Sequence, residues 1–119
     1  MHEITLLVQL VKMVEKEARA HAIASQIDSI VVQVGQLTDI VPKYLTEYYP
    51  NVTEGTLLEG SHLEVEYILG NGRCPHCEKV FRVVENKGIC PLCQTTDWEL
   101  LSGREFILKE IRMVEETNE

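Results

Sequence analysis

The chain has 119 residues, a formal net charge of −8 at pH 7 and 45% hydrophobic residues. This length predicts one small domain, or one domain with a metal-stapled module. The opening apolar stretch is interrupted by Gln9, Lys12 and Glu15, so the sequence shows neither a signal peptide nor a transmembrane run. We therefore expect a cytoplasmic protein with reduced thiols and no membrane partner.

The first half of the chain predicts two helices and a strand. Apolar residues recur at helical spacing between Thr5 and Ala22, which predicts an amphipathic helix whose apolar side packs in the core. The β-branched run Ile30–Leu37 is typical of a strand. Pro42–Tyr49 then predicts a short second helix that Pro50 ends.

Two further strands are predicted in the second half. In Leu63–Leu69 the residues alternate, and we expect four of them to point inward: Leu63, Val65, Tyr67 and Leu69. Glu64 and Glu66 point outward in the same prediction. Arg104–Val114 predicts a third long strand, which follows Gly103.

All four cysteines belong to two CxxC turns, here called knuckles: Cys74-Pro75-His76-Cys77 and Cys90-Pro91-Leu92-Cys93. Between them, Lys79–Val84 reads as a strand and Glu85–Gly88 as a turn, so both knuckles should meet. Four thiolates without a histidine or carboxylate ligand predict a closed structural Zn(II) site, because a catalytic zinc keeps one position open. Two disulfides, or an iron site of the rubredoxin type, remain as alternatives.

This cysteine module is an insertion between two predicted strands. Its entry and exit must lie close together, which favours residues 63–69 and 104–114 as antiparallel neighbours. The predicted fold is α+β, with a three-stranded sheet, two helices on one face and an inserted zinc-ribbon-like module. The corresponding domains are residues 1–70 with 103–119, and residues 71–102.

The charge pattern argues against nucleic acid as a partner. Residues 73–98 hold four Lys or Arg and three Asp or Glu, and four thiolates with one divalent cation would make this module negative. The sequence contains no GxGxxG, P-loop, GxSxG or HExxH motif. We therefore expect no catalytic residues and no enzymatic activity, and a protein or a metal ion as the partner.

The chain begins Met1-His2-Glu3, which can form a second metal site. Histidine at the second position protects the initiator methionine, so we expect Met1 to be retained. The α-amino group, the His2 amide and imidazole nitrogens, and the Glu3 amide can supply four nitrogens in one plane. Such ligation suits Ni(II) or Cu(II), and the intrinsic order of affinities favours copper. A frayed terminus is the common alternative.

Several segments together resemble the HypA/HybF family of nickel metallochaperones for [NiFe]-hydrogenase maturation. In chain order they are Met1-His2-Glu3, the amphipathic helix, Val34–Leu37, Glu54–Gly60, the two knuckles and Gly103–Phe106. The resemblance implies a nickel-binding α/β domain and a separate structural zinc domain. It also implies two partners, a HypB-type GTPase and the precursor of the hydrogenase large subunit.

The resemblance implies a role for each site residue. His2 is the principal Ni(II) ligand, together with the Met1 amine and the backbone nitrogens of His2 and Glu3. The Glu3 side chain either orients this site or contacts a partner. Zn(II) is held by Cys74, Cys77, Cys90 and Cys93.

Other interpretations stay open at this point. One is a zinc-ribbon adaptor with an inert N-terminus, and another is a rubredoxin-like electron carrier. A homodimer swapped through Gly70 and Gly103, and a role toward urease, are also open. Many such knuckles carry glycine after their second cysteine, where this chain has Glu78 and Gln94.

Overall fold

The computed structural model describes residues 2–21 and 27–114, with the side chain of His2 left out. Its elements, in chain order, are α1 (His2–Ala20), β1 (Ile27–Gly35), α2 (Pro42–Thr53), β2 (His62–Ile68), β3 (Asn71–Arg73), β4 (Val80–Arg82), β5 (Glu99–Ser102) and β6 (Phe106–Met113). Contacts divide the chain into two compact units. The first comprises Met1–Gln33, Asp39–Glu66 and Ile107–Glu119, and the second comprises Val34–Thr38 and Tyr67–Phe106.

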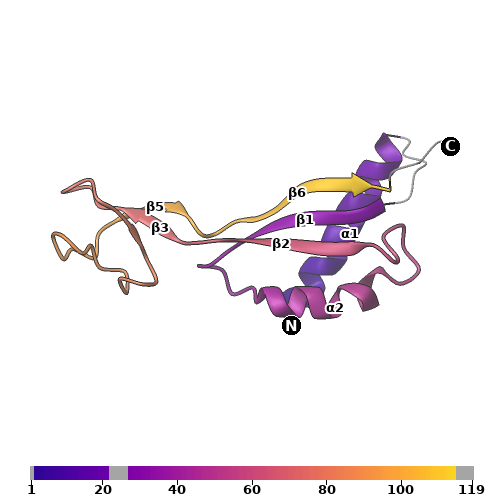
Figure 1. Cartoon of the computed structure of the whole chain (residues 1–119), viewed down its shortest axis with the longest axis horizontal. Coiled ribbons are helices and arrows are strands. Elements are labelled where there is room, and N and C mark those ends of the chain that lie inside the picture. The colour runs from indigo at the N-terminus through magenta and orange to yellow at the C-terminus, as the bar shows by residue number, and fades with distance from the viewer. Residues whose placement is uncertain (1, 22–26, 115–119) are drawn as a thin grey trace. The chain divides into compact units, whose positions relative to one another are not determined.

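The first sheet has the strand order β2-β1-β6 (Figure 1). The prediction that the strands of residues 63–69 and 104–114 are neighbours is therefore wrong, because β1 lies between them. β1 is the most buried strand, and its consecutive residues Ile30, Val31 and Val32 are at most 1% exposed. Since successive side chains point to opposite faces, β1 is buried on both sides and takes the central place. Pairing of β3 with β5 instead brings the two ends of the insertion together.

Helix α1 crosses one face of this sheet and packs against α2 (Figure 1). Its buried side chains recur at helical spacing, as predicted: Leu7, Leu10, Val11, Val14 and Ala18. The helix begins at His2 and not at Thr5, so His2 and Glu3 already belong to it. The predicted end at Ala22 lies outside the described residues.

Helix α2 continues through Pro50 to Thr53, so the predicted stop at Tyr49 is wrong. Proline removes one intrahelical hydrogen bond, which usually ends a helix. Here Leu45, Tyr49 and Thr53 are buried on one side of α2, and Thr53 Oγ1 donates to the Tyr49 carbonyl at 2.9 Å. Burial on both sides of the proline offsets the lost bond and keeps the helix intact.

Strand β2 differs from the prediction at Tyr67, which is 50% exposed where the alternation predicted an inward side chain. Its two carboxylates reach across β1 to β6, because Glu66 pairs with Lys109 and Glu64 with Arg112, each at 2.8 Å. Gln33 of β1 also donates to Glu66, at 3.2 Å. These polar contacts tie the three strands together on one face.

The second unit contains a small antiparallel sheet in the order β4-β3-β5. Phe81 and Val83 are buried in one cluster with two cysteines, and Trp98 packs on Phe81 edge to face, with ring centroids 6.4 Å apart. A Cβ atom on Gly72 would lie 2.7 Å from the Trp98 ring, so this position requires glycine. Leu37 joins the same cluster, although its sequence position predicted only the end of a strand.

In the part of the chain that the structure describes, neither helix has the length and apolar character that a membrane crossing requires.

Candidate metal sites

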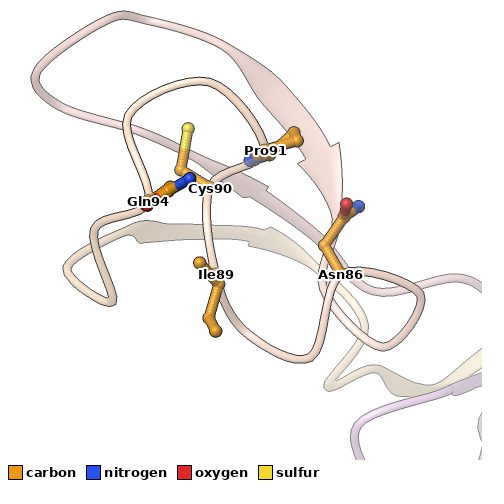
Figure 2. A pocket seen from close by; sticks show the side chains of 5 residues that line it. All are labelled: Asn86, Ile89, Cys90, Pro91 and Gln94. Carbon is orange, nitrogen blue, oxygen red and sulfur yellow. The ribbon is translucent and has the colours of Figure 1, made fainter.

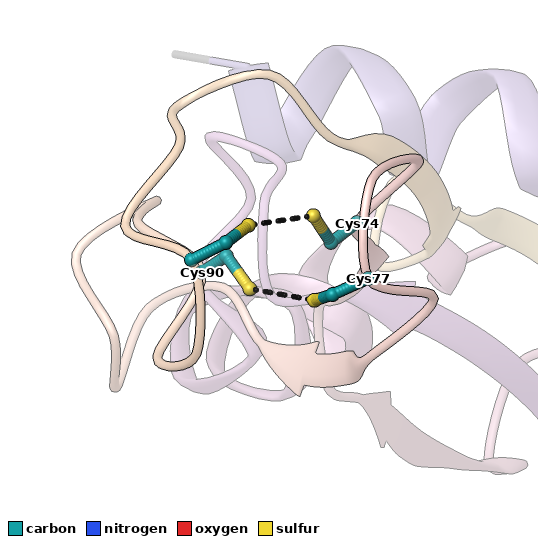
Figure 3. A group of neighbouring side chains, drawn as sticks. Cys74, Cys77 and Cys90 are labelled. Carbon is teal, nitrogen blue, oxygen red and sulfur yellow. Dashed lines mark hydrogen bonds between the residues drawn. The ribbon is translucent and has the colours of Figure 1, made fainter.

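The two knuckles bring all four cysteine sulfurs within 4.8 Å of one another. Cys74 Sγ lies 3.1 Å from Cys93 Sγ. Cys77 Sγ lies 3.6 Å from Cys90 Sγ (Figure 3). Each of these approaches joins one knuckle to the other. Within residues 2–21 and 27–114, no other group of three or more histidine, cysteine or acidic side chains gathers closely enough to hold a metal ion.

The backbone builds both knuckles in the same way. The Glu78 amide donates to the Cys74 carbonyl and the Gln94 amide to the Cys90 carbonyl, each at 2.9 Å. Both donors have positive φ, 62° at Glu78 and 60° at Gln94. This left-handed conformation costs a non-glycine residue roughly 1 to 2 kcal/mol, which explains why many such knuckles carry glycine there. The turn geometry is therefore retained here at the expense of local strain.

Burial and ionisation differ among the four thiols. Cys74 and Cys90 are buried, whereas Cys77 and Cys93 are exposed. Burial opposes ionisation of Cys90, but the backbone amides of Cys93 and Leu92 outweigh it and lower its pKa to about 6. At Cys93 the neighbouring Cys74 sulfur raises the pKa to about 12. Four sulfurs this close cannot all be thiolates unless a cation compensates the charge, and a closed four-sulfur set suits a zinc ion.

A hollow of about 460 Å³ lies beside the second knuckle (Figure 2). It is lined by Asn86, Ile89, Cys90, Pro91 and Gln94. Apart from the cysteine of the metal site, none of these side chains carries a charge. The hollow therefore offers no charged group of its own to a ligand.

His76 and His62 take no part in the cysteine cluster. His76, inside the first knuckle, lies with its Nε2 3.9 Å from Asp97 Oδ2, and both side chains are exposed. His62 begins β2 and is exposed.

The N-terminal site is described only in part. Met1 lies outside the described residues and the His2 side chain is not described, so the structure does not test whether the predicted nickel ligands come together. Glu3 is described and is only 7% exposed. Its Oε2 accepts a hydrogen bond from the Val41 amide at 3.3 Å, at the start of α2.

The contact between Glu3 and Val41 was not predicted from the sequence. Val41 is the N-cap residue of α2 and has no side chain that could cap the helix. Helix N-termini attract carboxylates, because their first amides have no acceptor within the helix. A helix that begins Val-Pro without a capping side chain of its own could have indicated that a distant acidic residue supplies the cap.

The chain is similar to known proteins over nearly its whole length. Residues 1–113 match the family model described as "Hydrogenase/urease nickel incorporation, metallochaperone, hypA". The hydrogenase maturation factors HypA of Geobacter sp. strain M21 and of Methylocella silvestris are 30% and 31% identical to this chain. In both cases the match covers 95% of this chain and 99% of the relative.

The fold also matches solved structures. The solution structure of the Ni metallochaperone HypA from Helicobacter pylori superposes with a TM-score of 0.66 at 21% identity, covering 96% of this chain and 98% of that one. A second solution structure of a HypA protein gives a TM-score of 0.67. Because the family model spans nearly the whole sequence, from Met1-His2-Glu3 through both knuckles, the chain belongs to the HypA family of nickel-incorporation metallochaperones.

Proposed function

We propose that this protein binds Ni(II) at its N-terminus and delivers it during maturation of [NiFe]-hydrogenase, with a structural Zn(II) ion held by the four cysteines. The observation that carries the proposal is the family match, which includes both the N-terminal Met-His-Glu sequence and the two knuckles. Nickel is cargo in this account, whereas zinc is a permanent part of the fold.

The first turn of α1 is suited to hold nickel through its backbone. The amides of His2 and Glu3 lie in the first turn, where N–H groups have no acceptor within the helix. They can lose their protons to a metal without breaking an intrahelical hydrogen bond. The Met1 amine and the His2 imidazole complete a set of four nitrogens, which favours square-planar Ni(II).

Glu3 serves this site through its backbone nitrogen. Its carboxylate is buried and engaged by the Val41 amide, so it fixes the first turn of α1 against α2. A planar site leaves its axial positions open, and an incoming donor can then take over the ion by ligand exchange. No part of the protein needs to unfold for this transfer.

The cysteine cluster holds Zn(II) in this proposal, through Cys74, Cys77, Cys90 and Cys93. The ion would link the two knuckles and stabilise a unit whose own core is small. Residues 71–102 then form a zinc domain, and residues 1–70 with 103–119 form the nickel domain. The protein has no catalytic role of its own.

Two partner proteins would act with this chain. A HypB-type GTPase exchanges nickel with the protein, and the hydrogenase large-subunit precursor receives it. Such a role places the protein in the cytoplasm, where the four cysteines stay reduced and available to metal.

Nickel titration by calorimetry tests this function, on chains without a tag. The wild-type protein is expected to bind one Ni(II), and the His2→Ala variant is expected to lose this binding. His62→Ala is the matched control, because His62 is an exposed histidine of the same unit, and it should bind as the wild type does. Equal nickel binding by wild type and His2→Ala would contradict the nickel function, and a zinc-ribbon adaptor with an inert N-terminus would then be the better account.

A further inference from the structure

Helix α1 carries a basic face in an acidic part of the chain. Residues 1–72 contain ten Asp or Glu and four Lys or Arg, and three of these four cations are Lys12, Lys16 and Arg19. Spacings of four and three residues place them on one side of α1, and all three are exposed. Arg19 pairs with Glu15 at 3.7 Å, whereas Lys12 and Lys16 form no ion pair within the described residues. Two cations therefore remain available on this face.

A groove of about 140 Å³ lies beside this face, between α1 and the end of α2. It is lined by Val8, Val11, Lys12, Glu15, Val52 and Thr56. Its aliphatic lining includes Val11, which is buried, and Val8, which is 38% exposed. The Glu15 carboxylate is already engaged, because it accepts a hydrogen bond from the Leu57 amide at 3.3 Å and pairs with Arg19. The groove thus offers an aliphatic surface and the free ammonium group of Lys12.

We propose that this surface, which we call the α1 docking face (Val8, Lys12, Lys16, Arg19 and the groove), binds an acidic amphipathic helix of a partner protein. One aliphatic side chain of that helix fills the groove. Carboxylates on either side of it meet Lys12 and Lys16. This arrangement follows the usual recognition of a helix by a groove, with an apolar anchor for affinity and rim charges for orientation.

Charge complementarity and the shape of the groove favour a protein as the occupant. Nucleic acid would meet a chain of net charge −8, and the groove is lined with aliphatic side chains and not with aromatic rings on which bases could stack. A membrane surface would need a broad apolar stripe on the helix, and among the described side chains of α1 the exposed large hydrophobic ones are only Val8 and Met13. An acidic helix with one aliphatic anchor fits both features.

The docking face is independent of the metal sites. None of its residues is a proposed nickel or zinc ligand, so the inference goes beyond the proposed function and does not rest on it. A variant of this face that loses the partner helix should still bind nickel, which separates failure of the one proposal from failure of the other.

The test is a titration of the full-length, ¹⁵N-labelled protein with a synthetic acidic helix. The probe carries one central leucine with glutamates three and four positions to either side. We expect saturable NMR shifts in the amides of residues 8–19 and 52–57. Replacing the leucine of the probe with alanine should weaken binding about fivefold, and raising the salt from about 50 to about 300 mM should also weaken it.

Two variants and one control locate the binding on the protein. Lys12→Glu should weaken binding about tenfold, because it reverses the charge at the groove itself. Val8→Phe should weaken it without any change of charge, because the larger side chain occupies the groove. Lys43→Glu is the matched control, since it makes the same charge change at an exposed position of α2 that does not line the groove, and it should change the affinity less than about twofold.

Several results would overturn the inference. Equal weakening by Lys12→Glu and Lys43→Glu would reduce the binding to unspecific charge attraction. The groove is not used if the probe without leucine binds as tightly as the original probe. The same conclusion follows if Val8→Phe binds the original probe as tightly as the wild-type protein does. Phosphatidylglycerol vesicles or a single-stranded oligonucleotide could instead bind more tightly than the acidic probe. If Lys12→Glu abolished that binding, the face would belong to a different class of partner.

Discussion

The carboxylate of Glu3 accepts a hydrogen bond from the backbone amide of Val41, 38 residues further along the chain. This contact joins the first turn of α1 to the N-terminus of α2, where a negative charge is favourable. The residue beside the proposed nickel site is therefore held by a second helix. Its carboxylate is committed to the fold, so in the proposed nickel site the backbone of residues 2 and 3 would serve the metal.

Removing this carboxylate should destabilise the protein without abolishing nickel binding. Glu3→Ala leaves the start of α2 uncapped, and we expect a loss of about 1 to 2 kcal/mol in the free energy of unfolding, measured by urea denaturation. Glu3→Gln retains an acceptor oxygen and should lose less. Nickel titration of both variants should still give one bound ion. Loss of the ion in Glu3→Gln, with the fold intact, would show that the carboxylate itself is a ligand.

Glycine after the second knuckle should stabilise the zinc-bound protein. Gln94 has φ of 60°, so Gln94→Gly relieves strain and should raise the stability of the zinc-bound unit by about 1 kcal/mol. Competition with a zinc chelator should then show roughly fivefold tighter retention of zinc. Gln94→Val is the opposite change, because a β-branched side chain tolerates positive φ poorly, and should weaken retention. Equal retention by both variants would mean that this strain does not act on the metal site.

Glu78→Gly is less informative, because the Glu78 carboxylate also pairs with Arg73 at 3.0 Å. Strain relief and the loss of a surface ion pair would then oppose each other. Gln94 makes no side-chain hydrogen bond within the described residues, so its substitution isolates the backbone effect.

Removal of zinc should unfold the second unit and spare the first. Trp98 is the only tryptophan, and it packs against the cysteine cluster, so its fluorescence reports on this unit alone. We expect a chelator, or acid that protonates the thiolates, to shift Trp98 emission to longer wavelength. The far-ultraviolet circular dichroism of α1 and α2 should persist. Loss of helical signal in step with Trp98 emission would contradict this independence.

The ion pair across β1 predicts a pH dependence. Lys109, together with the Gln33 amide, lowers the pKa of Glu66 below its ordinary value of 4.5. A lowered pKa in the folded protein means that the pair stabilises the fold above about pH 4.5, and that this stabilisation is lost as the pH falls through the lowered pKa. Lys109→Met should raise the pKa of Glu66 toward 4.5, measured by NMR titration of its side-chain carboxyl carbon.

Arg112→Met is the matched control for this titration. Arg112 pairs directly with Glu64 and acts on Glu66 only at a distance, so its removal should move the pKa of Glu66 much less. A shift as large as that in Lys109→Met would show that general charge, and not the direct contact, sets the pKa.

The local parts of this fold could be predicted from the sequence, because spacing determines them. Two CxxC knuckles separated by a strand and a turn have to meet, and the apolar spacing of α1 fixes its buried side. The strand order could not be predicted in the same way. Proximity of the two ends of the insertion suggested that β2 and β6 pair, but burial of Ile30 to Val32 on both faces places β1 between them.

Long-range contacts account for the other differences. Pro50 stays inside α2 because Tyr49 and Thr53 are buried around it, and a rule based on neighbouring residues does not include that packing. Glu3 caps a helix 38 residues away, which no local pattern in the first turn of α1 indicates. Both results depend on the tertiary packing of α2 and not on its local sequence.

The most direct test of the central claim compares nickel binding by the native chain with that of a chain extended by two residues before Met1. The extension leaves His2, Glu3 and all four cysteines in place but removes the free amine beside them. Elemental analysis and calorimetry should give one zinc in both proteins and one nickel in the native chain alone. Equal nickel binding by the extended chain would contradict an N-terminal site built on the Met1 amine.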